Sequence, residues 1–395
     1  MSYIAPAGTA IAPHTVAVSL LRGATHRGAY RNLQSALALH SGHDRAFLMS
    51  TGRAAMTLAL RAMRDLAPQR TDVLMPAYTC YSVPAAVKLA GLRPRLVDID
   101  PATLSPSPSA LEAIDTSRSL AIVSANLYGL PNDLTTLAGF ARARGIYLLD
   151  DAAQALGATL AGRPVGGFGD AGLYSFDKGK NITSIEGGAL VASGALGDTL
   201  ARHQVSLPAP RAARTAITAA KLLVYSLMLR PVAYGLMNRL PLGLGATPWE
   251  DDFPVSNYSP TLAGMTWRLF GSLEHLTRMR TTNAARLSDA LADAPGVSLP
   301  RIVSGANPAW ARYPMFLDPA RRERAVAALQ AAGIGATLSY PRALCDVPQV
   351  VELLASDQAP LPGARAVAER IVTLPTHAYV PGDLGERVRT ILRAV

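Results

Sequence analysis

Two side chains suited to cofactor chemistry, an aspartate and a lysine, lie about thirty residues apart in the middle of the chain. Asp151 closes the run 148–151, Leu-Leu-Asp-Asp, and Lys180 lies in the run 175–182, Ser-Phe-Asp-Lys-Gly-Lys-Asn-Ile. A lysine amine forms a Schiff base with the aldehyde of pyridoxal phosphate (PLP), and a carboxylate paired with the pyridine nitrogen keeps the ring an electron sink. This pattern predicts PLP as the cofactor, with Lys180 and Asp151 as catalytic residues.

Each of these residues also has a structural interpretation. An aspartate at a strand end is common without any catalytic role, and a lysine after a glycine is more often a surface residue. The functional interpretation is favoured because the two occur together and Gly187-Gly188 follows. Lys178 remains a rival for the covalent lysine.

The hydrophobic pattern between about residues 45 and 195 predicts the elements that position these residues. The predicted strands are 73–75, 94–99, 120–125 and 146–149, and the predicted helices are 53–65, 83–90 and 134–144. Strands that alternate with helices indicate a mainly parallel sheet. Ligands of such sheets bind beyond the carboxyl ends of the strands, where the strand 146–149 delivers Asp150 and Asp151.

Four consecutive motifs resemble those of the DegT/StrS-type nucleotide-sugar aminotransferases, a branch of the fold-type I PLP enzymes. They are Asp-Ala-Ala-Gln at 151–154, Gly-Arg-Pro-Val-Gly-Gly-Phe-Gly-Asp at 162–170, Ser-Phe-Asp-Lys-Gly-Lys at 175–180 and Glu-Gly-Gly at 186–188. The resemblance runs from about residue 45 to the C-terminus and is weak only in 200–260.

The resemblance implies an α/β fold of the fold-type I class with two domains. A large PLP-binding domain with a mainly parallel sheet would span 1–260, with 200–260 as an atypical apolar and basic insert. A smaller C-terminal α/β domain would span 261–395. In this second part the sequence pattern predicts helices at 272–292, 321–332 and 383–394 and short strands near 311–317 and 334–340.

The resemblance also assigns roles within the four motifs. Lys180 would carry the Schiff base, and Asp151 would hold the pyridine nitrogen. Gln154 would lie near the phenolic oxygen of the ring, and Ser175 would bind the phosphate. Asp150 fits the acidic residue that precedes the motif, not the pyridine partner. Because some relatives with histidine at the lysine position are dehydratases, Lys180 argues against that branch.

A glycine turn precedes the first predicted helix, in the run 50–53, Ser-Thr-Gly-Arg. The N-terminus of a helix offers free N–H groups to an anion. The family binds the PLP phosphate at this position, so Gly52 and Arg53 are predicted cofactor ligands. The alternative for Arg53 is a side chain that points to solvent.

The run 76–82, Pro-Ala-Tyr-Thr-Cys-Tyr-Ser, resembles a family segment whose aromatic residue stacks on the cofactor ring. Cys80 occupies that position here, and Tyr81 follows it, so both are candidate cofactor contacts. Either Tyr81 or Tyr78 supplies the ring, or a small residue covers the cofactor.

Three further candidates come from segments that resemble the family less closely. Tyr340 in Tyr-Pro and His377 in Leu-Pro-Thr-His are predicted near the substrate, with a packing role as the alternative for His377. Asn257 is the candidate for the asparagine that the family supplies from the partner subunit to the phosphate.

Composition limits the function classes. The chain has 395 residues, 49% of them hydrophobic and 17% charged, which is typical of a globular protein with two domains. Cys80 and Cys345 form neither a disulfide framework nor a zinc spacing, and no metal site is predicted. No signal peptide is recognised, so a reducing, cytoplasmic location is expected. The net charge of +10 comes without a nucleic-acid-binding motif, so nucleic acid is not an expected partner.

The segment 211–240 is apolar and basic. Its apolar runs of about eight residues are much shorter than the roughly twenty needed to span a bilayer. Five basic residues accompany them: Arg211, Arg214, Lys221, Arg230 and Arg239. One interpretation is an interfacial element that contacts the membrane peripherally. The favoured alternative is a helix pair buried against the core or a partner subunit.

Together these patterns predict a PLP-dependent aminotransferase. By resemblance it would move an amino group from an amino acid, expected to be glutamate, to a nucleotide-linked keto-sugar in polysaccharide or secondary-metabolite biosynthesis. It would form a homodimer with shared active sites. The alternatives are a non-sugar or lipid-linked keto acceptor, a PLP-binding regulatory protein without turnover, and a membrane-associated binding module.

Overall fold

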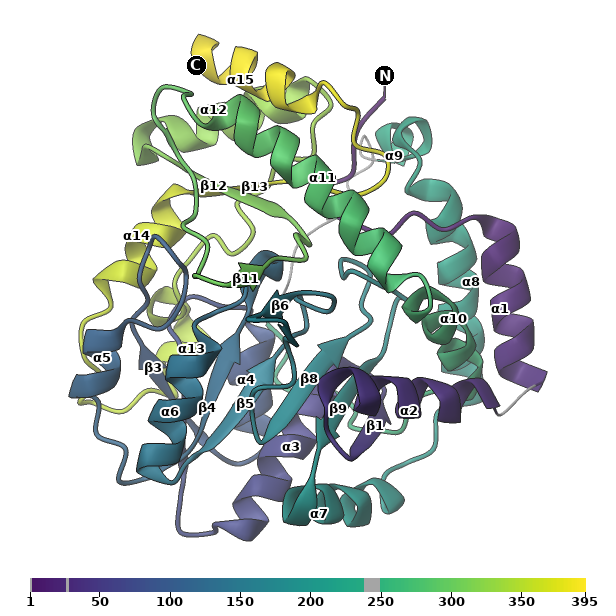
Figure 1. Cartoon of the computed structure of the whole chain (residues 1–395), viewed down its shortest axis with the longest axis vertical. Helices are drawn as coiled ribbons and strands as arrows, with labels where there is room; N and C mark the ends of the chain where they lie inside the picture. Colours follow the sequence, from purple (N-terminus) through teal and green to yellow (C-terminus); the bar gives the residue numbers. More distant parts are fainter. Residues whose placement is uncertain (1, 26–27, 238–248) are drawn as a thin grey trace.

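The computed structural model describes residues 2–25, 28–237 and 249–395. Its centre is a seven-stranded sheet in the order β1-β9-β8-β5-β4-β2-β3 (Figure 1). The strands are β1 Arg45–Met49, β2 Asp72–Pro76, β3 Arg93–Val97, β4 Ser119–Ala125, β5 Tyr147–Asp151, β8 Ala171–Ser175 and β9 Gly188–Ala192. Strand β9 pairs antiparallel with both neighbours, so it alone runs against the other six. The predicted mainly parallel sheet is confirmed.

Helices cover both faces of this sheet. They are α3 Gly52–Leu66, α4 Ser82–Leu89, α5 Pro108–Ala113, α6 Leu134–Arg144 and α7 Gly194–Val205. Side chains alternate along the strands. In β5, Leu149 joins the core formed with α3 and α4, whereas Leu148 packs in the core formed with α6. Burial on both faces explains why these strands are continuous apolar runs.

Local sequence signals fix the ends of α6 as predicted. The carboxylate of Asp133 caps the helix by accepting a hydrogen bond from the backbone N–H of Thr136 at 3.0 Å. The helix ends at Gly145, whose φ of 58° lies in the left-handed region that glycine adopts without a steric penalty. This cap directs the chain into β5 and therefore positions the acidic pair at its end.

The C-terminal part contains a second, three-stranded antiparallel sheet. Its strands are β10 Val297–Ser298, β12 Tyr313–Leu317 and β13 Ile371–Leu374, in the order β10-β12-β13. Its helices are α11 Leu273–Leu291, α12 Pro319–Ala331, α14 Pro362–Arg370 and α15 Leu384–Ala394. The three predicted helices of this part are confirmed.

The predicted strand at 334–340 is wrong. Only isolated bridges form there, between Ile334 and Ile4 and between Thr337 and Thr373. Ser339 has a φ of 57°, which breaks the extended conformation. The place of this strand beside β12 is taken by β13. The domain boundary at residue 260 stays a prediction.

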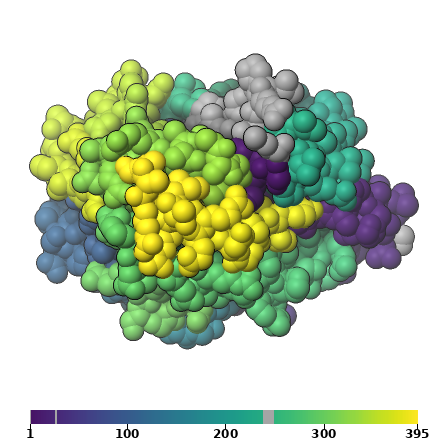
Figure 2. Space-filling view, turned by 90° about the horizontal axis from the view of Figure 1, so that it is seen from above, coloured from purple at the N-terminus to yellow at the C-terminus, as the bar shows by residue number. Residues whose placement is uncertain are grey.

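The remaining elements are further helices and short segments. The helices are α1 Pro13–Thr25, α2 Gly28–Ser41, α8 Ala212–Met228, α9 Pro231–Met237, α10 Pro260–Phe270 and α13 Pro348–Val351. The short elements are β6 Thr159–Leu160, β7 Arg163–Pro164, β11 Ala306–Asn307, and 3-10 turns at Leu127–Gly129 and Leu344–Asp346. Seen from above, the N-terminal segment emerges beside the yellow C-terminal helix (Figure 2).

The segment 211–240 forms α8 and α9, and its residues from 238 onward, including Arg239, lie outside the described part. Helix α8 buries one stripe, formed by Thr218, Leu222 and Ser226. Its other faces are largely exposed, so burial in the core is confirmed for one stripe only. Among the described residues no single helix is long and apolar enough to cross a membrane; α8 and α9 reach these criteria only as a pair bent by 111°.

Candidate functional site

Asp150 and Asp151, at the carboxyl end of β5, have different environments. The carboxylate of Asp150 accepts hydrogen bonds from the backbone N–H groups of Gly166 at 2.7 Å and Phe168 at 3.2 Å. It also accepts one from the side-chain amide of Asn126 at 2.9 Å. Complete burial raises the pKa of Asp150 to about 6. Asp150 therefore holds the 166–168 turn against the sheet and is not available to a ligand.

Asp151 lies beside the lysine loop. Its carboxylate accepts a hydrogen bond from the backbone N–H of Ala153 at 2.9 Å. Burial raises the pKa of Asp151, whereas this hydrogen bond and the positive charge of Lys180 act to lower it. The charge of Lys180 thus acts on the carboxyl group of Asp151, and a catalytic pair of these two residues stays a prediction.

The two lysines in the loop after β8 differ in their burial. Lys180 is half-buried, and Lys178 is exposed. The backbone of Lys180 is fixed on both sides: its N–H donates to the carbonyl of Asp177 at 3.1 Å, and its carbonyl accepts from the hydroxyl of Thr9 at 2.9 Å. Lys178 is therefore the less suitable covalent lysine, and the role of Lys180 stays a prediction.

A cradle without Cβ atoms forms where α3 begins between β8 and β9. A Cβ added to Gly52 would lie 3.1 Å from the hydroxyl oxygen of Ser175. A Cβ added to Gly188 would lie 2.6 Å from the backbone nitrogen of Gly52. Thr51 caps the helix by accepting from the N–H of Ala54 at 3.1 Å. The hydroxyl group and the N–H groups of the first helical turn suit an anion such as phosphate.

The side chain of Arg53 does not join this cradle. Its guanidinium pairs with Glu250 at 2.7 Å and lies 4.8 Å from the centroid of the Phe253 ring. The Arg53 side chain is thus directed to partners distant in sequence, and its predicted phosphate contact is not observed. Only the backbone N–H of Arg53 remains at the cradle.

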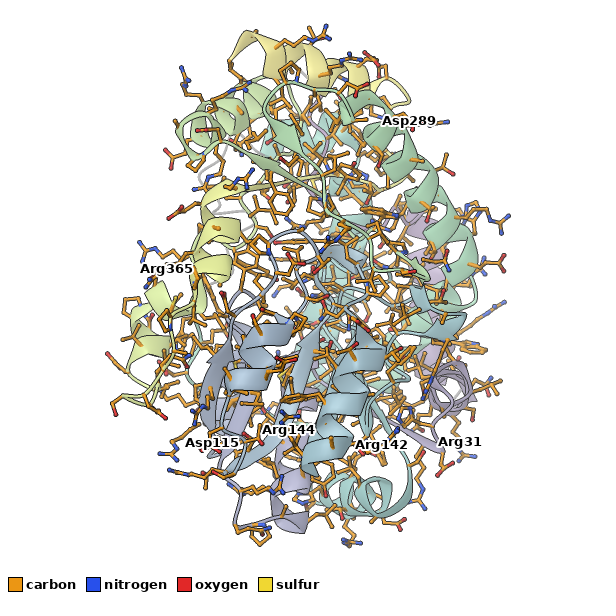
Figure 3. All side chains as sticks on the ribbon, turned by 60° about the vertical axis from the view of Figure 1, so that its left-hand side comes forward. Arg31, Asp115, Arg142, Arg144, Asp289 and Arg365 are labelled. Carbon is orange, nitrogen blue, oxygen red and sulfur yellow. The ribbon has the colours of Figure 1, made fainter. Side chains whose placement is uncertain are left out.

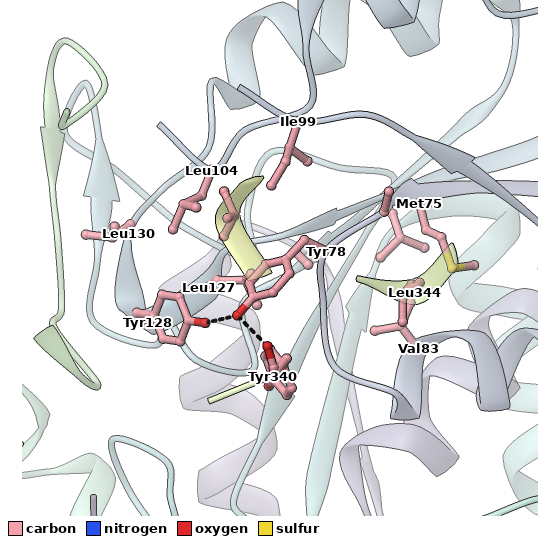
Figure 4. Close-up of a cluster of buried hydrophobic side chains, with 14 of the residues drawn as sticks. Met75, Tyr78, Val83, Ile99, Leu104, Leu127, Tyr128, Leu130, Tyr340 and Leu344 are labelled. Carbon is pink, nitrogen blue, oxygen red and sulfur yellow. Dashed lines mark hydrogen bonds between the residues drawn. The ribbon is translucent and has the colours of Figure 1, made fainter. Parts of the chain in front are cut away.

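A tyrosine network surrounds the predicted cofactor contacts. The hydroxyl of Tyr78 lies 3.1 Å from that of Tyr128 and donates to the carbonyl of Tyr340 at 3.1 Å (Figure 4). Tyr78 is completely buried, so it does not offer its ring to a ligand. Gln154 links the network: its oxygen accepts from the N–H of Tyr128, and its amide donates to the hydroxyl of Tyr340, both at 3.0 Å. Gln154 and Tyr340 thus hold each other in place.

Cys80 and Tyr81 remain the candidates that could cover a bound ring. Both are half-buried. The sulfur of Cys80 accepts a hydrogen bond from the hydroxyl of Ser82 at 3.0 Å. The rings of Tyr81 and Tyr340 lie 6.0 Å apart. Because Tyr78 is buried, Cys80 and Tyr81 are the two residues left that could cover the PLP ring.

Two residues of the site were missed in the sequence. Thr79 is buried, and its hydroxyl has no hydrogen-bond partner among the described residues. A buried polar atom without a partner fits a site that a ligand completes. Tyr128 has a φ of 60°, a strained conformation for a bulky residue. Thr79 could have been identified from the sequence, because it lies in the run 76–82 that resembles the family segment. No sequence pattern indicated the strained backbone at Tyr128.

Two predicted site residues have structural roles instead. His377 is completely buried, and its Nε2 is hydrogen-bonded to the carbonyl of Ala5 at 2.8 Å. It therefore packs the N-terminal segment and does not line a substrate entrance. Asn257 donates its side-chain amide to the carbonyls of Gln204 at 3.4 Å and Leu207 at 3.2 Å. These bonds engage its donors within its own chain, and a contact of Asn257 with a partner's phosphate stays a prediction.

Comparisons with known proteins give one family and one fold. The sequence profile described as the DegT/DnrJ/EryC1/StrS aminotransferase family matches residues 16–205 and 259–393. The UDP-N-acetyl-3-dehydro-alpha-D-glucosamine 3-aminotransferase of Acidithiobacillus ferrooxidans is 34% identical over 163 residues, which is 41% of this chain and 44% of the relative. The L-glutamine:scyllo-inosose aminotransferase of Streptomyces griseus is 39% identical over 165 residues, 42% and 38% of the two chains. The chain thus matches less than half the length of these relatives.

Solved structures extend the likeness to the whole fold. The Escherichia coli GDP-4-keto-6-deoxy-D-mannose-3-dehydratase with bound hydrated PLP superposes with a TM-score of 0.75. The match covers 99% of this chain and 99% of that chain at 19% identity. At this identity the likeness establishes the fold, and the chemistry has to be argued from the site itself.

Proposed function

The chain belongs to the DegT/DnrJ/EryC1/StrS aminotransferase family, and from this premise we propose that it is a PLP-dependent aminotransferase. It moves an amino group from an amino acid, with glutamate as the expected donor, to a keto-sugar carried on a nucleotide. The observation that carries this proposal is the buried carboxyl group of Asp151 at the carboxyl end of β5, together with the cradle formed by Gly52, Ser175 and Gly188.

The residues present fit PLP. The cradle of Gly52, Ser175 and the α3 N-terminus would hold the phosphate, and Asp151 would hold the ring nitrogen. Gln154, the last residue of the motif that begins with Asp151, is hydrogen-bonded to Tyr340. It would face the phenolic oxygen of the PLP ring. When bound, PLP supplies an aldehyde for amine exchange and a ring that delocalises negative charge.

Lys180 then has two tasks. Its amine would hold bound PLP covalently at rest, and once free its Nζ would move the proton at the substrate carbon as general base and acid. The hydrogen bonds that fix its backbone keep the amine close to that carbon, so little entropy is lost in the proton transfer.

Asp151 must be ionised to stabilise a protonated ring nitrogen. Burial alone favours its neutral form, and the Ala153 N–H and the Lys180 charge oppose that effect. A positive charge on the nitrogen of the bound PLP ring would also oppose the effect of burial on the pKa of Asp151. The same carboxyl group therefore favours cofactor binding and is itself kept ionised by it.

The acceptor is proposed from the relatives. The name of the Acidithiobacillus relative states a ketone on a UDP-linked sugar, which supports a nucleotide-linked keto-sugar here. A second candidate has its own observation: the Streptomyces relative, at higher identity, acts on scyllo-inosose, a ketone not linked to a nucleotide. The intact pair of Lys180 and Asp151 disfavours a regulatory protein without turnover.

We also propose a homodimer with shared active sites, which is the commonest symmetry of such enzymes. The free thiols of Cys80 and Cys345 and a nucleotide-linked substrate suit the cytoplasm.

A screen of keto-sugar nucleotides and cyclic keto-polyols tests the acceptor. Purified protein with PLP and glutamate or glutamine is mixed with each ketone, and the amine product is detected by mass spectrometry. The proposal predicts an aminated sugar nucleotide. Amination of cyclic keto-polyols alone would favour the second candidate, and no amination of any ketone by any donor would contradict transaminase activity.

A further inference from the structure

Helices α8 and α9 expose an apolar surface that the site does not use. Six large apolar side chains on it are between 38% and 68% exposed: Ile217, Leu223, Val224, Leu227, Val232 and Leu236. We call these six residues, together with Arg211, Lys221 and Arg230, the α8–α9 face. Eight of the thirteen large exposed apolar side chains among the described residues lie on α8, α9 and the adjoining α1.

Helix α8 is apolar on two sides. One stripe, with Leu222 at its centre, is buried where α8 packs beside α1 at the edge of the molecule (Figure 1). A surface helix that buries one stripe normally carries polar residues on the opposite side. Here the opposite side presents Ile217, Val224 and Leu227 to solvent. Exposed apolar surface of this extent marks an interaction site.

The charged side chains on α1 and α8 all have one sign, and the nearby carboxylate of Glu186 pairs with Arg214. No Asp or Glu occurs between residues 199 and 249, and none occurs before Asp44, which includes α1. Arg211, Lys221 and Arg230 are exposed and form no ion pair with any residue that the structure describes. The α8–α9 face is therefore apolar and cationic together.

This combination selects among the possible occupants. A second copy of the chain that covered this face with its own α8–α9 face, as at the axis of a two-fold dimer, would bring the basic residues together with no carboxylate from α1, α8 or α9. An anionic lipid surface offers both an apolar layer and negative charge, which is what an interfacial amphipathic helix requires. The face also lies in the stretch 206–258, which the family profile does not match.

We propose that the α8–α9 face docks the protein on an anionic lipid surface, with α8 and α9 lying along it. The 111° bend between the helices and the short length of α9 suit peripheral contact. The hydroxyl of Tyr225 on α8 donates to the carbonyl of Lys178 at 3.2 Å and accepts from the N–H of Thr9 at 2.8 Å. Docking therefore holds the lysine loop immediately behind the helix that contacts lipid.

The test is co-sedimentation of the full chain, loaded with PLP, with two kinds of vesicle. The protein is expected to sediment with phosphatidylcholine vesicles that contain phosphatidylglycerol and to be released by high salt. It is expected to stay in solution with vesicles of phosphatidylcholine alone. Lys221→Glu/Arg230→Glu should lower binding at least about tenfold, because each basic residue near the surface contributes and each reversal adds repulsion.

A matched control separates local charge from net charge. Arg142, which projects from α6 (Figure 3), and Arg324 on α12 are exposed and far from α8 in sequence. Arg142→Glu/Arg324→Glu makes the same change in net charge and should bind vesicles as the wild type does. Equal loss in both double variants would overturn the proposal, as would failure of the wild type to bind anionic vesicles.

An apolar variant tests the second part of the face. Val224→Asp/Val232→Asp should abolish vesicle binding while the mass in solution and the absorbance of bound PLP stay those of the wild type. If this variant instead dissociates the protein into single chains and the wild type does not bind vesicles, the face is a subunit interface and the proposal is wrong.

Discussion

At the scale of single residues, two adjacent carboxyl groups are given separate tasks by their neighbours. Asp150 is held by two backbone N–H groups and Asn126, whereas Asp151 is held by one N–H group and faces the charge of Lys180. Both are buried, so burial does not distinguish them. The number of hydrogen bonds and the nearby charge make the first a structural anchor and suit the second to its proposed role as a cofactor ligand.

Asp150 predicts a pH dependence of stability. Its pKa is raised from 3.8 to about 6 by burial, so the folded protein binds more protons than the unfolded chain between these values. The contribution of Asp150 to stability is therefore present below pH 4 and is lost as the pH rises through 6, by about 3 kcal/mol in total.

Asp150→Asn removes this dependence. The free energy of unfolding of the variant should rise relative to the wild type by about that amount between pH 4 and 7. Chemical denaturation of both proteins at several pH values measures this difference in the free energy of unfolding. His377, whose pKa is lowered to about 4 by burial, has the opposite effect, but it is present in both proteins and cancels in the difference. A difference that stays constant with pH would contradict the assignment.

Lys180 and Lys178 predict different behaviour of the cofactor. Lys180→Ala should abolish the yellow absorbance of lysine-bound PLP and lower kcat by several orders of magnitude, because the covalent bond and the proton-transfer group are lost together. Lys178→Ala should keep the band and most of the activity, since Lys178 is exposed. The reverse result would assign the covalent lysine to Lys178.

At the scale of elements, the site depends on a junction of three of them. Helix α3 begins where β8 ends and β9 starts, and Gly52 and Gly188 allow the backbones to approach. Because Gly52 carries no side chain, the N–H groups at the start of α3 are open to the phosphate that we propose binds there.

Gly188→Ala tests this junction. Its Cβ would lie 2.6 Å from the backbone nitrogen of Gly52, so α3 must shift away from Ser175. PLP affinity, measured by titration of absorbance, should fall at least tenfold, about 1.4 kcal/mol. Gly139→Ala on α6 meets no atom within 4 Å and should leave the affinity unchanged while stabilising the helix by up to about 1 kcal/mol. Unchanged affinity in Gly188→Ala would count against the cradle.

The elements around the site could be predicted from sequence because their signals are local. The alternation of β2 to β5 with helices, and both ends of α6, follow from apolar period and caps. The strand predicted at 334–340 was wrong because its alternating apolar residues match a strand pattern but form only isolated bridges. The strand β13 was missed because four residues carry too little pattern, and its pairing with β12 decides its state.

The same division applies to the site residues. Lys180, Asp151, Gly52 and Ser175 lie in motifs, and the structure places Gly52 against Ser175 as that prediction requires. The positions of Arg53, Asn257 and His377 are set by Glu250, by the carbonyls of Gln204 and Leu207, and by Ala5 respectively. These partners are distant in sequence, so no local pattern shows them.

At the scale of the whole molecule, the N-terminal segment connects distant parts of the chain. Ile4 bridges to Ile334, and the fully buried Arg280 on α11 donates to the carbonyl of Gly8 at 2.6 Å and to the hydroxyl of Thr376 at 3.2 Å. Arg280 has no ion pair among the described residues, and burial lowers its pKa to about 10, so it stays charged at neutral pH. Thr9 then carries this connection to Lys180.

Arg280→Met should loosen the segment. It leaves the carbonyl of Gly8 and the hydroxyl of Thr376 without their donor and should cost about 2–4 kcal/mol of stability. Hydrogen exchange should become faster at residues 3–9. Arg278→Met on the same helix removes only an exposed pair with Glu274 and should change stability by less than about 0.5 kcal/mol. Equal effects of both substitutions would contradict the role of Arg280.

The account as a whole depends on amino-group transfer, and the donor half-reaction tests it most directly. The purified protein loaded with PLP is mixed with glutamate, and with glutamine in parallel, without any ketone, and its absorbance is followed. The account predicts that the yellow band of the lysine-bound cofactor disappears as the amine form accumulates, and that the corresponding keto acid is released in equal amount. A band that persists unchanged with these and all other amino acids would contradict it.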